Sequence, residues 1–314
     1  MTRKSLFRIL IISIFIMLIS ALLGKVTIAS DNARAAADFL NIGIGARAAA
    51  LGGAFTSVVD DATAAYWNPA GLTSVRGIGI NLSHFSWYQD LNLEYFGVAY
   101  PVNDRLTLAV SAAYLSYGTI EGYDVNDNPT GNVASTYDLS AGLSAGFRFS
   151  DNYSAGLGLK LIEVSLAGTK ASAVAVDLGM KYAFDRYLFS LVATNLGQNI
   201  KFDQVANKLP VAIKAGVAVK PFGPTGLVSL EIEDQLYGNL IIKNGFELNF
   251  NNKYFLRTGY NYFPQQENRI LGQGLTFGAG AMFGPAQFDY SFTPRDNFSS
   301  ETIHRFSLDF HFAK

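Results

Sequence analysis

Apolar and polar residues alternate one for one over residues 136–149, and this is the clearest structural signal in the chain. Odd positions carry apolar side chains, from Tyr137 to Phe149, whereas even positions carry polar side chains or glycine. Because successive side chains of a β-strand point to opposite faces, this segment has one apolar and one polar face. Its apolar face begins and ends in aromatic residues, which is typical of a strand that spans a membrane between two aromatic girdles.

The same period continues from Gly77 to the C-terminus. It predicts fourteen strands, at 77–88, 93–101, 106–117, 133–149, 153–165, 171–184, 187–196, 209–221, 225–236, 241–251, 253–262, 271–283, 286–293 and 302–312. An even number is typical of single-chain bacterial barrels. The last strand ends in Phe312, two residues before the C-terminus, and resembles the insertion signal of outer-membrane barrels.

The predicted connections also sort by length. Short turns lie at 103–105, 151–152, 184–186, 221–226, 251–253 and 284–285. Between them lie mostly longer loops, at 118–132, 197–208, 263–270 and 294–301, and the short members of that set are 89–92, 166–170 and 237–240. Short periplasmic turns and longer outer loops are characteristic of outer-membrane proteins. The sequence therefore predicts an all-β protein, a transmembrane antiparallel β-barrel in a Gram-negative outer membrane.

The N-terminus is typical of a secretory signal peptide. Arg3, Lys4 and Arg8 precede an apolar run, and Thr27-Ile28-Ala29 offers a cleavage site between small residues. The run is also long enough for a single membrane anchor, but we expect cleavage because the rest of the chain is barrel-like. The predicted division is a signal peptide at 1–29, a plug segment rich in alanine and glycine at 30–76, and the barrel at 77–314.

Composition narrows the function classes. Removal of residues 1–29 leaves 20 basic and 25 acidic residues, and this acidic balance argues against a nucleic-acid partner. The chain has no cysteine, which excludes disulfides, thiolate metal sites and a lipid anchor on an N-terminal cysteine.

The strand register also predicts which charged residues face the lumen. The basic set is Arg148, Lys160, Lys181, Lys214, Lys220, Arg257 and Arg305, and the acidic set is Asp138, Asp177, Glu231, Glu233, Glu247, Asp289 and Asp309. An ion-selective pore would favour one sign. The balance fits either ion pairs around a filled lumen or charges that face lumen water, and both remain open at this stage.

Residues 41–72 are the predicted filler of the lumen. Asp60 or Asp61 is placed to cap a short helix over 62–66, and Asn68-Pro69 should end that helix because a residue before proline disfavours the helical region. Small residues would let this backbone pack tightly, and Arg47 is placed to pair with lumen acids.

The same segment resembles the opening of outer-membrane proteins of the PorV/PorQ type. The resemblance rests on Gly45, Arg47, Gly52, Gly53, Asp60, Asp61, Trp67, Asn68, Pro69, Ala70 and Gly71. That family is similar to the FadL-type transporters of hydrophobic compounds. The resemblance implies a fourteen-stranded barrel with an internal N-terminal plug, and a role in protein export and surface attachment by type IX secretion.

Two alternative functions remain open. A FadL-like barrel would pass a hydrophobic small molecule such as a fatty acid through an opening in its wall, and a structural barrel would transport nothing. The expected partners are accordingly outer-membrane lipid and either secreted or secretion-machinery proteins or a hydrophobic small molecule.

An enzyme is the least favoured class, and we expect no catalytic residues, cofactor or metal. His304 and His311 are seven residues apart on one strand and face opposite sides, so they cannot share a metal. Gly43-x-Gly45-x-x-Ala48 superficially fits a dinucleotide fingerprint but has no strand before it. Strand glycines such as Gly156, Gly158, Gly278 and Gly280 indicate either kinks or a wall that faces the plug.

Overall fold

The computed structural model describes residues 35–87, 91–166, 168–202, 205–265, 274–294 and 302–312. The predicted signal peptide at 1–29 lies outside the described residues, as does most of the loops predicted at 263–270 and 294–301. Cleavage after Ala29 therefore stays a prediction.

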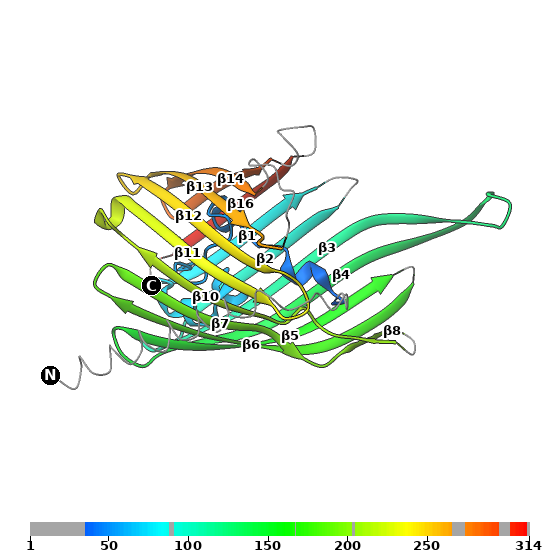
Figure 1. Ribbon diagram of the computed structural model, residues 1–314, viewed down its shortest axis with the longest axis horizontal. Coiled ribbons are helices and arrows are strands. Elements are labelled where there is room, and N and C mark those ends of the chain that lie inside the picture. The colour runs from blue at the N-terminus through cyan, green and yellow to red at the C-terminus, as the bar shows by residue number, and fades with distance from the viewer. Residues whose placement is uncertain are drawn as a thin grey trace.

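Fourteen antiparallel strands close into a barrel, which confirms the predicted fold class (Figure 1). The barrel strands are β1 (Ile78–Ser86), β2 (Asn92–Pro101), β3 (Leu106–Tyr123), β4 (Pro129–Arg148), β5 (Tyr153–Leu166), β6 (Thr169–Phe184), β7 (Tyr187–Gly197), β10 (Ala212–Val219), β11 (Gly226–Gln235), β12 (Leu240–Phe250), β13 (Tyr254–Tyr262), β14 (Leu275–Phe283), β15 (Ala286–Thr293) and β16 (Ile303–Phe312). Each pairs with its neighbours in chain order, and β1 pairs with β16 at the closing seam. Closure leaves no strand edge within the bilayer.

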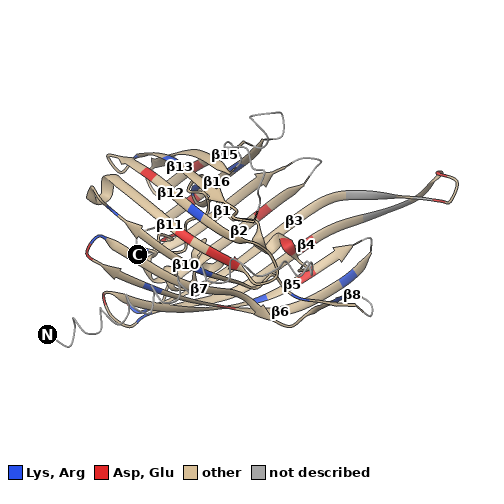
Figure 2. Cartoon of the chain, viewed as in Figure 1, with Lys and Arg blue, Asp and Glu red and all other residues tan. Residues whose placement is uncertain are grey.

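Side-chain alternation sorts the two faces of the wall as predicted. Leu143, Leu157 and Leu161 are more than half exposed on the outer face, whereas their neighbours Ser144 and Lys160 are buried inside. Figure 2 shows long uncharged stretches along the strands. An apolar outer face suits contact with lipid, and the polar residues are left to the lumen.

Two predicted loops contain regular structure. The segment 118–132 is mostly strand, because β3 and β4 continue as a paired hairpin that projects beyond the barrel on the right of Figure 1. The segment 197–208 holds a short hairpin of β8 (Ile200–Phe202) and β9 (Val205–Asn207). The alternation is weak in both segments, which are short of large apolar residues, so the sequence alone did not indicate strands there.

The described residues 35–76, here called the plug, lie inside the barrel. They form the 3-10 helix η1 (Asp38–Asn41), α2 (Ala46–Ala50), α3 (Ala64–Trp67) and the 3-10 helix η2 (Pro69–Ser74), and a further 3-10 turn, η3 (Gly223–Thr225), lies between β10 and β11. The plug begins at the long-loop end, where the Ala36 amide donates to the Lys208 carbonyl (2.9 Å), and reaches β1 at the short-turn end. Among the described residues, no helix is both long and apolar enough to cross a bilayer.

Candidate functional site

Glycines on the inner wall make room for the plug at two places. On β4, β5 and β6, Gly146, Gly156 and Gly179 face the turn at Asn68–Ala70, and a methyl group on Gly156 would overlap the Pro69 carbonyl carbon. Across the lumen, Gly245, Gly259 and Gly278 of β12, β13 and β14 face residues 50–52 in the same way. Since a side chain at any of these positions would overlap backbone or side-chain atoms of the plug, the glycines fix where the plug lies.

Asn68 holds the first of these contacts together. Its side-chain Oδ1 accepts from the Ala70 amide (3.0 Å), and its Nδ2 donates to the carbonyls of Thr56 (2.9 Å) and Met180 (3.3 Å). Asn68 is extended, so α3 ends at Trp67 and η2 begins at Pro69, as the Asn-Pro pair predicts. One buried amide thus joins two parts of the plug to β6.

A chain of alternating charges ties the plug to the wall. Arg47 lies 2.6 Å from Asp60 of the plug and 3.1 Å from Glu247 of β12. Arg257 of β13 bridges Glu247 (2.6 Å) and Asp289 of β15 (2.5 Å), with its side chain fully buried. The ion pairs thus connect four segments of the chain, from Asp60, whose side chain is 48% exposed, to the fully buried pair of Arg257 and Asp289.

The two neighbouring plug acids differ in their surroundings. Asp60 is ion-paired with Arg47, and its side chain is 48% exposed to the lumen. Asp61 is buried. Asp61 accepts from the Thr63 amide (2.7 Å) and hydroxyl, just ahead of α3. The prediction that Asp60 or Asp61 caps this helix is wrong, because α3 begins at Ala64 rather than at residue 62 and its N-cap residue is Thr63, without a side-chain cap hydrogen bond.

A second charged cluster surrounds Trp67. Lys243 donates to Glu233 (2.6 Å), and Lys214 lies 3.3 Å from the same carboxylate. Both ammonium groups lie over the Trp67 ring, at 5.4 Å for Lys214 and 5.8 Å for Lys243. Glu231 beside them accepts from the Thr56 amide of the plug (2.9 Å).

A third group lies at a bulge between β6 and β7. Lys160 lies 2.8 Å from Asp177 and donates to Asn195, and Asp177 also accepts from the Asn195 amide (2.7 Å). The Asn195 side chain in turn donates to the Pro210 carbonyl (2.9 Å). These contacts fix the wall at the register shift between β6 and β7.

The remaining predicted residues face the lumen outside these clusters. Asp138 accepts from Tyr117 (2.8 Å), and Arg305 lies over the Phe85 ring at 4.4 Å. Asp309 accepts from Asn81 (2.7 Å). Two cations hold plug carbonyls, since Arg148 donates to Thr73 and Lys181 to Val59 (2.8 Å).

Three residues of these clusters were absent from the sequence prediction. Lys243 could have been found, because it lies four positions before Glu247 on the same strand and therefore on the same face. Thr56 and Asn195 carry no such signal, since a plug threonine and a bulge asparagine gain their roles from tertiary contacts.

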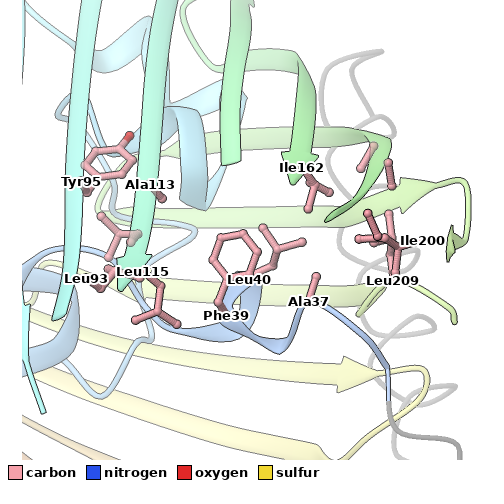
Figure 3. Close-up of a cluster of buried hydrophobic side chains, with 14 of the residues drawn as sticks. Ala37, Phe39, Leu40, Leu93, Tyr95, Ala113, Leu115, Ile162, Ile200 and Leu209 are labelled. Atoms are coloured by element: carbon pink, nitrogen blue, oxygen red, sulfur yellow. The ribbon is translucent and has the colours of Figure 1, made fainter. Parts of the chain in front are cut away.

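The two ends of the lumen differ in polarity: one contains a cavity lined by charged residues, and the other is filled by apolar side chains. At the short-turn end a cavity of about 640 Å³ is lined by charged residues that include Arg76, Arg148, Lys181, Lys220 and Asp151. At the long-loop end, apolar side chains fill the lumen instead, with Leu40 of the plug packed among Leu93, Leu115 and Ile162 of the wall (Figure 3). Both alternatives for the lumen charges therefore apply: some form ion pairs around the plug, and others line the open cavity at the short-turn end.

Comparison with known proteins identifies the family. The family model described as type IX secretion system protein PorV matches residues 28–252. The chain belongs to the PorV family. No curated protein sequence matches it.

Solved structures similar to this PorV-family barrel are transporters. The toluene transporter TodX of P. putida is 14% identical, with a TM-score of 0.60, and the match covers 87% of this chain and 99% of that one. The toluene transporter TbuX of Ralstonia pickettii is 15% identical, with a TM-score of 0.59, and covers 86% and 98%. At these identities the likeness shows a shared fold alone. The Gram-negative outer-membrane location follows from membership in the PorV family.

Membership in the PorV family places the chain among proteins of type IX secretion. Within the described ranges, no three His, Cys, Asp or Glu side chains gather as a metal site would require. His84 faces outward and lies 2.6 Å from Glu94, on the rim of the wall.

Proposed function

We propose that this PorV-family barrel is a docking component for exported proteins at the outer surface of the cell. The observation that carries this proposal is the filled lumen, in which the plug is bonded to both sides of the wall through its glycine contacts and charge chain. A barrel bonded shut through its middle is better suited to present its outer end than to conduct. The match to a secretion family supports the same reading.

A second candidate is the passage of a hydrophobic small molecule. The apolar cluster at the long-loop end favours it, and so does the fold shared with toluene transporters. For this function the η1 segment would have to leave its place among Leu93, Leu115 and Ile162, since these side chains pack directly on it.

The test is a deletion strain assayed for two outputs, the amount of protein attached to the cell surface and the uptake of labelled toluene and oleate. We expect surface attachment to fall and uptake to stay unchanged, with both normal once the gene is restored. Unchanged attachment with lost uptake would establish the solute channel instead. If neither output changed, the barrel would be structural.

A further inference from the structure

The cavity at the short-turn end contains four cations that form no ion pair. Its volume of about 640 Å³ is within the range of small-molecule sites, roughly 300–1,000 Å³. Of the six Lys and Arg side chains that line it, Arg47 and Arg257 are ion-paired with acids. Within the described ranges, no carboxylate forms an ion pair with the other four, here called the cavity cations, which are Arg76, Arg148, Lys181 and Lys220.

Three of the cavity cations converge on the end of the plug. Arg148 on β4 and Lys181 on β6 line the inner wall, with β5 between their strands. Arg148 donates to the Thr73 carbonyl, and Lys181 donates to the Ser74 hydroxyl (3.4 Å). Arg76 lies two residues further along the plug and lines the same cavity. Wall and plug therefore present positive charge to one shared space.

The cavity cations also have hydrogen-bond donors to spare. An ammonium group has three donor hydrogens, and a guanidinium group has five. Arg148 donates to one plug group and Lys181 to two, the second being the Val59 carbonyl (2.8 Å). The side chains of Arg76 and Lys220 donate to no group in the described part of the chain. Most of the donors are thus left for a ligand.

The acids that line the cavity leave most of this charge uncompensated. Asp60 and Glu247 form their ion pairs with the α2 arginine. Asp61 and Asp309 are buried in a small pocket near β16, where each accepts a hydrogen bond. Asp151 is exposed on the turn between β4 and β5.

Phosphate is the anion that best matches these surroundings. A phosphate group has a charge of about −1.5 to −2 and three acceptor oxygens, whereas a carboxylate has one charge and two oxygens. Arginine binds phosphate through two parallel hydrogen bonds, and lysine binds it as a point charge. Two linked phosphate groups would therefore balance four cations. Short-turn residues such as Asn152 and Gly223 are part of the lining, so the cavity reaches periplasmic water.

We propose that the cavity cations bind a small soluble compound of the diphosphate class at the periplasmic end of the lumen. The site is independent of the proposed docking function at the outer surface. Because Arg148 and Lys181 already hold the last turn of the plug, a bound diphosphate would link the plug to the wall. A ligand that binds only the folded barrel would also stabilise it.

The first experiment measures pyrophosphate binding to the barrel isolated from its outer membrane, by calorimetric titration in an uncharged maltoside detergent. The test variant combines Arg76→Gln with Lys220→Gln, since neither side chain is bonded to the described protein. The matched control combines Arg105→Gln with Arg186→Gln, which removes the same charge from exposed short turns outside the cavity. We expect the test variant to lose at least about tenfold in affinity, equivalent to ~1.4 kcal/mol, and the control to bind normally.

Equal affinities of the two double variants would overturn the site, because pyrophosphate would then bind elsewhere or through net charge alone. The same conclusion would follow if sodium chloride at equal ionic strength gave as much heat as pyrophosphate. Folding of both variants is checked by heat-modifiable gel mobility.

The second experiment needs no variant and tests the class of ligand. The unfolding temperature of the unmodified barrel is measured with pyrophosphate and with citrate at equal ionic strength. We expect pyrophosphate to raise it more. An equal or larger effect of citrate would overturn phosphate as the ligand class.

A third measurement separates a soluble ligand from a lipid headgroup with the same chemistry. Phosphatidylglycerol is titrated in the same detergent, and we expect it to bind more weakly than pyrophosphate because a headgroup is held at the membrane surface, outside the closed wall. Tighter binding of the lipid, lost in the Arg76 and Lys220 double variant, would overturn the assignment to a soluble diphosphate.

Discussion

Glycine residues set the fit between the plug and the wall because they are the places where two backbones meet. Gly146, Gly156 and Gly179 receive the Asn68–Ala70 turn, and Gly245, Gly259 and Gly278 receive residues 50–52. At Gly146, Gly156, Gly245 and Gly259 the nearest plug atoms belong to the backbone, so an added methyl group there has to be absorbed by a shift of the backbone.

Gly156→Ala is expected to destabilise the barrel by about 1–3 kcal/mol, the usual cost of overpacking, because its methyl group would overlap Pro69. Gly158→Ala is the matched control, on the same strand and face, where the closest atoms are 3.1 Å or more away. Thermal unfolding followed by gel mobility measures both. Equal unfolding temperatures for the two variants would show that the plug does not bear on this wall.

At this scale the sequence indicated much of the chemistry but not the partners. Alternation alone placed Lys160, Asp177, Glu233 and Arg257 in the lumen, since parity along a strand is independent of the rest of the fold. It could not pair them, because pairing depends on strand stagger and on the plug. The role of Asn195 depends on a bulge that no local pattern reveals.

Elements are joined across the lumen by charge as well as by packing. Arg257 of β13 forms ion pairs with Glu247 of β12 and Asp289 of β15. Glu247 also forms an ion pair with Arg47 of α2. The strands were predictable because each repeats the period of two over many residues. The four short helices of the plug, η1, α2, α3 and η2, contain too few residues to show a periodic pattern. The only clear sequence signal for where one of them ends was the Asn68-Pro69 pair after α3.

Arg257→Met is expected to cost about 3–5 kcal/mol, because it leaves Asp289 buried without its cation. Arg186→Met, at an exposed short turn, is the control and should change stability by no more than about 0.5 kcal/mol. Urea unfolding of the two variants in the same lipid vesicles gives the comparison. A loss in Arg257→Met no greater than in the control would mean that the buried chain of charges contributes nothing to stability.

The whole molecule is a closed cylinder whose last strand meets its first. At that seam Ser83 of β1 lies opposite Ser307 of β16, their hydroxyls are 2.9 Å apart, and Ser307 also accepts from the Ala46 amide of the plug (2.7 Å). The plug is thus bonded to β16 at the seam, and Ser307 connects it to Ser83 of β1.

The double variant Ser83→Cys and Ser307→Cys should form a disulfide on oxidation, since residues opposite each other in an antiparallel pair lie within bridging distance. We expect the oxidised barrel to resist unfolding more than either single variant and to support normal surface attachment. Attachment that was lost on oxidation and regained with reductant would instead show that the seam must part during export.

The position of the plug also indicates the order of two assembly steps, the entry of the plug and the closure of the barrel. The plug precedes β1 in the chain, lies wholly inside the ring, and bonds to β16, which is synthesised last. If the barrel closed first, the plug would have to pass through it from the short-turn end to the long-loop end, past the charge clusters. The plug must therefore be in place while β1 and β16 are still apart, so it serves as the surface on which the cylinder is closed. Plug substitutions should accordingly act first on the rate of assembly.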